Sequence, residues 1–174
     1  MGLEVYLFEA NPVFNEALVR SKEKYTAKGM KVHIFPSTVA DIEDGIRTFY
    51  IDTVNKDHDF WGSSIYAEHH DAKASNAKGT RLTSVNLALW LLQNFSPRDF
   101  VVVKMDIEGA EYELVPHLAQ MKAGIVIDHL LVEWHHFDVG GTPEEKALRE
   151  EKAKLGSAML VNDGTNMPPY DSAA

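Results

Sequence analysis

The sequence contains no cysteine, so a disulfide framework and a thiolate zinc site are both excluded, and any metal would need carboxylate or imidazole ligands. Positive charge is scarce, with 17 Lys and Arg against 26 Asp and Glu and a net charge of −9 at pH 7. This balance argues against a nucleic-acid partner, which clustered basic residues would bind. No window approaches the roughly 18 apolar residues of a membrane span, and the first residues carry no basic leader. We therefore expect a cytoplasmic protein that binds neither nucleic acid nor membrane.

The chain has 174 residues, of which 45% are hydrophobic, which suits one domain with a substantial core. In the first half we expect a strand, then a helix capped by Asn11 and Pro12, then a second strand at 31–35. The stretch 38–52 is expected to form two strands that turn at Asp44 and Gly45. Residues 53–79 are polar and irregular, which is typical of a long loop over the edge of the sheet.

The second half alternates helix and strand. Apolar residues at helical spacing follow Ser84, and the pair Thr142 and Glu145 forms a reciprocal cap for a last helix. The runs Phe100–Val103 and 130–132 are continuously apolar, which is typical of strands covered on both faces of a parallel sheet. The expected elements are a helix after Ser84, a strand at 100–105, a helix from near Glu108 to Gly124, a strand at 129–134, a helix from Thr142 and a short strand at 158–161. This pattern favours an open α/β sheet, whose ligands lie beyond the carboxyl ends of its strands.

Acidic side chains follow three of the expected strands. Glu9 follows the first strand, Asp106 the strand at 100–105, and Glu133 stands near the end of the strand at 129–134. A carboxylate in the position of Glu9 can hold a ribose diol. An equally good interpretation is that Glu9 only stabilises the start of the helix that follows.

The stretch "DIEGAE" at 106–111 holds three acids within six residues. One interpretation is that Asp106 or Glu108 caps the next helix. A cap needs one acid, however, and three would repel one another unless a cation, a proton or a substrate donor lies among them. This favours an active-site edge, at which Lys104 can neutralise Asp106.

Histidines add two candidate groups. His135 follows a strand expected to neighbour Asp106, which favours a role in binding substrate or moving a proton. His69 and His70, with acids on either side, could bind a metal, but a loop cluster of this kind is more often solvated.

Three blocks, "VYLFEANPVFNEAL", "FVVVKMDIEGAEYELVPHL" and "IDHLLVEWH", together resemble the FkbM-type methyltransferases that use S-adenosylmethionine. The resemblance runs from about Leu3 to His136. It implies a Rossmann-like class I methyltransferase sheet with helices on both faces, S-adenosylmethionine as the methyl donor, and O-methylation of a hydroxyl on a sugar or other small molecule.

The resemblance also implies roles for individual residues. It places Glu9 at the ribose, with Asn11 and Thr38 beside the cofactor. It assigns the reaction centre and the acceptor side to a further set of residues: Asp106, Glu108 and His135 as catalytic, and Glu111 and Glu133 as acceptor-binding. A divalent cation held by Asp106 and Glu133 is an alternative that the sequence leaves open, although we predict no metal site.

The chain departs from the family at its start. The family begins with a strand and a glycine-rich turn, and that strand lies centrally, between the strands that end here at Glu9 and Asp106. We therefore expect residues 1–174 to form one incomplete domain, with a gap of roughly 10 Å in the sheet. Another polypeptide could fill it, the flanking strands could close on each other, or the chain could be a fragment. The functions considered are an O-methyltransferase, a non-catalytic scaffold subunit and, with least support, a metal-dependent hydrolase.

Overall fold

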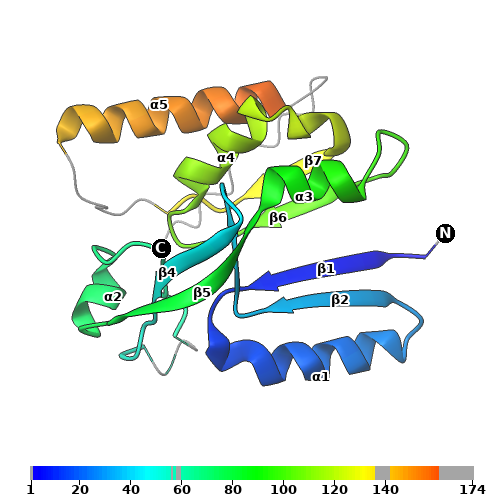
Figure 1. The fold of residues 1–174 in the computed structure, drawn as a ribbon, viewed down its shortest axis with the longest axis horizontal. Coiled ribbons are helices and arrows are strands. Elements are labelled where there is room, and N and C mark those ends of the chain that lie inside the picture. Colours follow the sequence, from blue (N-terminus) through cyan, green and yellow to red (C-terminus); the bar gives the residue numbers. More distant parts are fainter. Residues whose placement is uncertain (1, 56, 58–59, 136–141, 161–174) are drawn as a thin grey trace.

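The computed structural model describes residues 2–55, 57, 60–135 and 142–160, and it is a mixed α/β structure (Figure 1). Seven strands are present in this part of the chain: β1 (Glu4–Glu9), β2 (Lys31–Pro36), β3 (Thr38–Asp41), β4 (Gly45–Tyr50), β5 (Gly79–Asn86), β6 (Val102–Met105) and β7 (His129–Val132). The helices are η1 (Pro12–Phe14), α1 (Asn15–Thr26), α2 (His70–Ala74), α3 (Leu87–Asn94), α4 (Glu111–Gln120), η3 (Ala123–Val126) and α5 (Pro143–Leu160). No helix in the described ranges has the length and apolar character needed to cross a bilayer.

The first unit is a strand, a helix and a parallel strand, as the sequence predicts. The side chain of Asn11 accepts a hydrogen bond from the N–H of Val13, and Pro12 occupies the first position of the short helix η1. Strands β1 and β2 run parallel, with Glu4 opposite Lys31 and Glu9 opposite Pro36. Helix α1 lies along β2, and because the two strands run parallel, their carboxyl ends lie at the same edge (Figure 1).

The predicted turn at Asp44 and Gly45 exists, but the two strands beside it do not pair with each other. Both pair with β5, β3 in parallel and β4 antiparallel. The sequence analysis missed β5 because two of its inward-facing residues, Ser84 and Asn86, are polar, so the strand lacks an apolar alternation. The central strand of this sheet is therefore one that hydrophobic patterning does not reveal.

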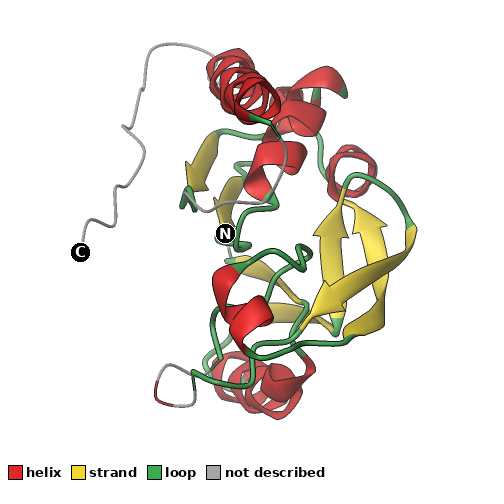
Figure 2. Ribbon diagram, turned by 90° about the vertical axis from the view of Figure 1, so that its left-hand side faces the viewer, coloured by secondary structure: helices red, strands yellow, loops and turns green. Residues whose placement is uncertain are grey.

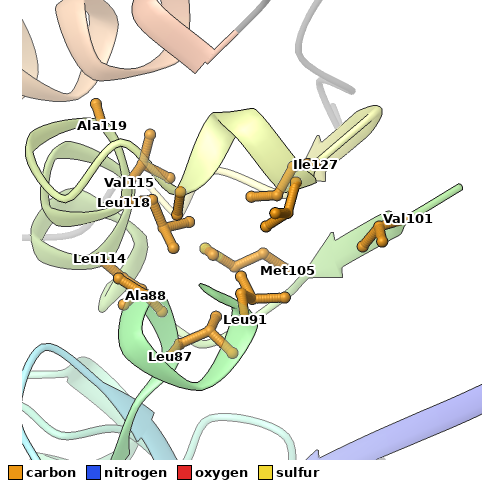
Figure 3. Packing of buried hydrophobic residues seen from close by; sticks show 12 residues of the cluster. Leu87, Ala88, Leu91, Val101, Met105, Leu114, Val115, Leu118, Ala119 and Ile127 are labelled. Carbon is orange, nitrogen blue, oxygen red and sulfur yellow. The ribbon is translucent and has the colours of Figure 1, made fainter. Parts of the chain in front are cut away.

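Strands β6 and β7 form another parallel pair, and their apolar runs do not mean burial on both faces. In β6, Val102 is 52% exposed whereas Met105 is 3% exposed. The covered face packs against a cluster drawn mainly from α3, α4 and the segment after α4, which includes Leu91, Leu114 and Leu118 (Figure 3). The prediction of two covered faces is wrong for β6 in the described structure.

The strands form three separate hydrogen-bonded groups, β1–β2, β3–β5–β4 and β6–β7 (Figure 2). Within the described residues, β1 pairs only with β2 and β6 only with β7, so each has one edge without a backbone partner. Phe8 of β1 nevertheless packs against the core cluster of α3 and α4. The pairs β1–β2 and β6–β7 thus share a core without sharing a hydrogen-bonded ladder.

Helix α4 continues through Pro116, although proline removes one backbone N–H donor from the helix. Helix α5 lies against α4 and begins with the predicted reciprocal cap, in which Thr142 and Glu145 bond to each other's backbone N–H groups. The strand expected at 158–161 is wrong for its first three residues, which belong to α5, and Val161 lies outside the described residues.

Gly156 permits the close approach of α5 to α4. A Cβ atom at this position would lie 2.9 Å from the Cα of Pro116, closer than real Cβ contacts allow. We expect Gly156→Ala to lower the free energy of unfolding by about 1 to 3 kcal/mol, because the two helices must move apart. Urea unfolding followed by circular dichroism measures this loss. Lys154→Ala, an exposed change on the same helix, should have almost no effect, and an equal loss in both variants would contradict the packing argument.

Candidate active site

The turn after β6 brings acidic side chains together by an unusual backbone path. Glu108 has a φ of 50° and Gly109 a φ of 96°, both in the left-handed region. A non-glycine residue there costs of order 1 kcal/mol or more, so the surrounding contacts must hold it in place. One such contact is a 2.7 Å hydrogen bond that Ser64 Oγ donates to the carbonyl oxygen of Glu108.

This turn also tests the capping interpretation of "DIEGAE". Helix α4 starts at Glu111, its N-cap residue is Ala110, and no side chain caps it. Asp106 and Glu108 are therefore not helix caps, and the capping interpretation is wrong for both. The helix starts later than expected because the positive φ angles of Glu108 and Gly109 are incompatible with helical backbone.

Glu111 lies beneath the cluster and is completely buried. Its Oε2 accepts a 2.9 Å hydrogen bond from the N–H of Gly109, and its Oε1 accepts from both the N–H and the Nδ1 of His135, at 2.7 and 2.9 Å. This carboxylate ties the turn after β6 to the segment after β7. The resemblance implied that it touches the acceptor, whereas the structure places it behind the His135 ring.

The other nitrogen of His135 faces two more carboxylates. Nε2 lies 3.5 Å from Glu108 Oε1 and 3.7 Å from Asp106 Oδ1. Asp106 is also 3.2 Å from Lys104 Nζ, so the predicted neutralisation of Asp106 by Lys104 is confirmed. His135 is thus held on one side by the buried carboxylate of Glu111 and faces two accessible carboxylates on the other.

These contacts change the acidity of the imidazole. Burial alone lowers the pKa of His135, but the hydrogen bond with Glu111 and the charges of Glu108 and Asp106 raise it to about 9. His135 is therefore an imidazolium at neutral pH. Together with Lys104 it supplies the positive charge that three neighbouring acids require, which answers the question of how they coexist.

Glu9, at the end of β1, belongs to the same electrostatic region. Burial raises the pKa of its carboxyl above the ordinary value, the N–H of Asn11 lowers it through a 2.7 Å hydrogen bond, and the negative charge of Asp106 raises it further. The bond to Asn11 shows that the local, turn-stabilising interpretation of Glu9 holds in part. The hydrogen bond from Asn11 uses Oε1 of Glu9. The effect of Asp106 on the pKa of Glu9 shows that the acids at the ends of β1 and β6 interact electrostatically.

Three other predicted site residues make hydrogen bonds within the fold. Asn11 is buried, and its amide donates to Ser63 Oγ while its oxygen caps η1. Thr38 is buried, and its hydroxyl donates to the carbonyl of Pro36. The backbone N–H of Glu133 donates to Met105 and extends the pairing of β6 and β7 by one residue. Asn11 and Thr38 therefore already have structural partners.

The segment 60–75, expected to be a loop over the edge of the sheet, instead contributes to this region. Ser63 contacts Asn11, Ser64 contacts Glu108, and the buried His69 places its Nε2 at 3.4 Å from Glu108 Oε2. It also contains α2, which the sequence analysis missed. Sequence reasoning overlooked these serines because a polar loop has no pattern that shows which side chains point inward. The signal that the sequence did offer for this segment was the group of histidines and acids at 68–71.

Two groups of described residues could hold a metal ion, each with three ligand atoms lying within 4.8 Å of one another. The groups are His69, His70 and Asp71, and Asp106, Glu108 and His135. When no cation is bound, the protonated imidazole and Lys104 balance the charge of the acids in the second group. We therefore describe it as a cluster of acids around an imidazolium.

Comparison with known proteins adds one finding to this geometry. The family model described as the Methyltransferase FkbM domain matches residues 1–157, which is most of the chain. Searches of curated proteins and of solved structures returned no match. Methyl transfer is the general activity that this family supports. The match includes every residue of the acidic cluster and of the segment that packs on it, and the chain belongs to the FkbM methyltransferase domain family.

Proposed function

We propose that the protein is an S-adenosylmethionine-dependent O-methyltransferase that acts on a hydroxyl of a sugar or another small molecule. One observation carries the proposal: acids that follow β6 lie around His135, and the carboxyl of Glu9, at the end of β1, is affected by the charge of one of them, Asp106. Ligands of α/β sheets bind at such ends. The family supplies the reaction type, and the cluster supplies a place for it.

Glu9 is the residue proposed to hold the cofactor. Its carboxylate stands at the end of β1, where it can accept hydrogen bonds from the two hydroxyls of a ribose. Asn11 is proposed to act beside it through the backbone turn that it caps, and Thr38 by shaping the start of β3, since both side chains already have partners.

S-adenosylmethionine, when bound, supplies a methyl group that is already electrophilic. The chain then has to orient the acceptor hydroxyl and take its proton as the new bond forms. Because His135 is protonated at neutral pH, a carboxylate, Asp106 or Glu108, is the better proton acceptor. His135 balances their charge, Glu111 positions His135, and Glu133 is proposed to face the acceptor.

The pairs β1–β2 and β6–β7 are proposed to be halves of one Rossmann-like sheet within a single incomplete domain, residues 1–174. One edge of β1 and one edge of β6 have no backbone partner among the described residues, and this and the shared core support the arrangement, with a strand from another polypeptide or from a longer chain between them. We also propose a cytoplasmic location, no binding to nucleic acid or membrane, and no requirement for a metal.

Binding of S-adenosylmethionine tests the function. We expect calorimetric titration to detect binding to the wild-type protein. Glu9→Gln should weaken binding by about 10-fold to 100-fold, because hydrogen bonds to a charged group contribute about 1.5 to 3 kcal/mol.

Glu4→Gln is the matched control, since Glu4 lies on the same strand at its opposite end. It should leave the affinity unchanged. Absence of binding by the wild-type protein, both alone and after addition of a glycine-rich strand segment, would reject the proposal. Equal losses in the two variants would remove Glu9 from the site.

The second candidate is a non-catalytic scaffold subunit of a larger assembly, which the strand edges of β1 and β6 favour, since neither has a backbone partner in the part of the chain that the structure describes. Unpaired strand edges are surfaces on which a neighbouring chain can add a strand. A stable monomer that binds S-adenosylmethionine would eliminate this candidate.

A further inference from the structure

The buried histidine of the segment before α2 has no role in the function proposed above, yet it contacts the reaction centre. His69 is 2% exposed and comes from a part of the chain almost forty residues before Glu108. Its Nε2 lies 3.4 Å from Glu108 Oε2, while the other oxygen of that carboxylate lies 3.5 Å from Nε2 of His135. The Glu108 carboxylate thus stands between two imidazoles.

The second ring nitrogen of His69 settles which tautomer faces Glu108. Nδ1 accepts a hydrogen bond from the backbone N–H of Asp71, in the capping position of α2. An accepting nitrogen carries no proton, so in the neutral ring the proton is on Nε2, on the side of the carboxylate. His69 therefore presents an N–H to Glu108 without needing to be charged.

Glu108 needs such support. Its backbone is in the left-handed region, and Ser64, from the same segment as His69, fixes its carbonyl oxygen. Without a second contact at the side chain, the carboxylate could rotate toward solvent and away from His135. A separation of 3.4 Å is long for a hydrogen bond, but contacts of this kind often tighten when a substrate binds.

We propose that His69 is a positioning residue, which holds the Glu108 carboxylate against His135 through its Nε2–H. The inference rests on the function proposed above for its catalytic meaning, but the contact itself is independent of the cofactor. The segment 60–75 then has a role in the site, because Ser64 fixes the backbone of Glu108 and His69 fixes its side chain.

Two substitutions distinguish the role of Nδ1 of His69 from that of Nε2. His69→Asn keeps an oxygen near the position of Nδ1, so α2 stays capped, but loses the group that reaches Glu108. His69→Gln keeps a donor near the position of Nε2. If His69 were only a cap, H69N would resemble the wild-type protein and H69Q would differ; if it positions Glu108, the reverse holds.

The readout is the titration of the His135 ring, followed by its NMR signals and assigned with His135→Gln. The groups that face this ring are Asp106, Glu108 and Glu111. We expect H69N to lower the titration midpoint by about one pH unit, because Glu108 no longer faces the imidazolium, and H69Q to keep it near the wild-type value. In a Glu108→Gln background, H69N should produce no further shift, since the effect acts through that carboxylate.

An unchanged midpoint in H69N, or an equal shift with and without Glu108, would overturn the proposal. If H69N does not fold, His69→Ser, which also offers a capping oxygen, replaces it; if neither folds while H69Q does, the role is structural and the proposal fails. Calorimetry with S-adenosylmethionine on the same variants tests the proposed function separately from the positioning role of His69. A shifted midpoint in a protein that binds no cofactor would support the positioning role and reject the proposed function.

Discussion

Replacing Glu111 with alanine is expected to lower the free energy of unfolding by about 3 to 5 kcal/mol, because it breaks a buried ion pair from one side. Its carboxylate accepts three hydrogen bonds, from the backbone of Gly109 and from the backbone and ring of His135. The substitution leaves the buried N–H of Gly109 and the partly buried N–H of His135 without an acceptor, and it removes the anion that holds the imidazolium. Urea unfolding at pH 7 measures the loss.

Two further variants make this result specific. Glu111→Gln keeps the shape but turns an NH2 group toward the N–H of Gly109, so we expect a smaller but clear loss of about 2 kcal/mol. Glu144→Gln is the matched control, because Glu144 is also an acid in the first turn of a helix but is exposed. It should change stability by less than about 0.5 kcal/mol. A comparable loss in Glu144→Gln would show that the helix dipole, and not the buried contacts, explains the effect of Glu111.

Stability should fall as the pH rises from about 6.5 to about 9, since His135 releases its proton in this window. The folded pKa of about 9 lies above the unfolded value of about 6.5, so the protonated form is bound more favourably in the folded state. The contribution is complete below about pH 6.5 and is lost as the pH passes the folded pKa. The difference corresponds to at most about 3 kcal/mol for this ring, whose side chain is 20% exposed.

Urea unfolding at several pH values from 6 to 9.5 measures this decline, and His135→Gln should abolish most of it. His129→Gln, an exposed change at the start of β7, should retain the wild-type slope. Tyr112, whose pKa burial raises to about 12, adds a loss only above about pH 10, outside this window. A wild-type protein with flat stability from pH 6.5 to 9 would show that the acids do not hold an imidazolium.

The first unit of the fold shows which elements can be predicted from short sequence patterns. Asn11, Pro12 and the apolar strand before them specify β1, η1 and α1 because caps and helical periodicity act within a few residues. The same is true of the cap at Thr142 and Glu145. Strand β5 was missed because its inward residues are polar and gain their partners only from other segments, as when Asn86 donates to the carbonyl of Ile42.

In the candidate site, too, some features could be predicted from the sequence and others could not. The sequence placed Asp106, Glu108 and His135 at strand ends, and the structure brings them together. It could not show that Glu111 lies beneath His135, because that contact depends on where the start of α4 lies relative to the segment after β7. It also could not show that His69 turns inward, since loop residues have no periodicity from which burial can be inferred.

The sequence by itself determined the family, the order of most strands and helices, and the set of acids at the strand ends, because these depend on short motifs and on periodicity along the chain. Only the tertiary structure decided which acid is buried, which residue carries the balancing proton and which loop packs on the cluster. The physical reason is that burial and charge interactions depend on distances between segments far apart in the chain. A carboxylate such as Glu111 acquires its role from the groups that fold around it.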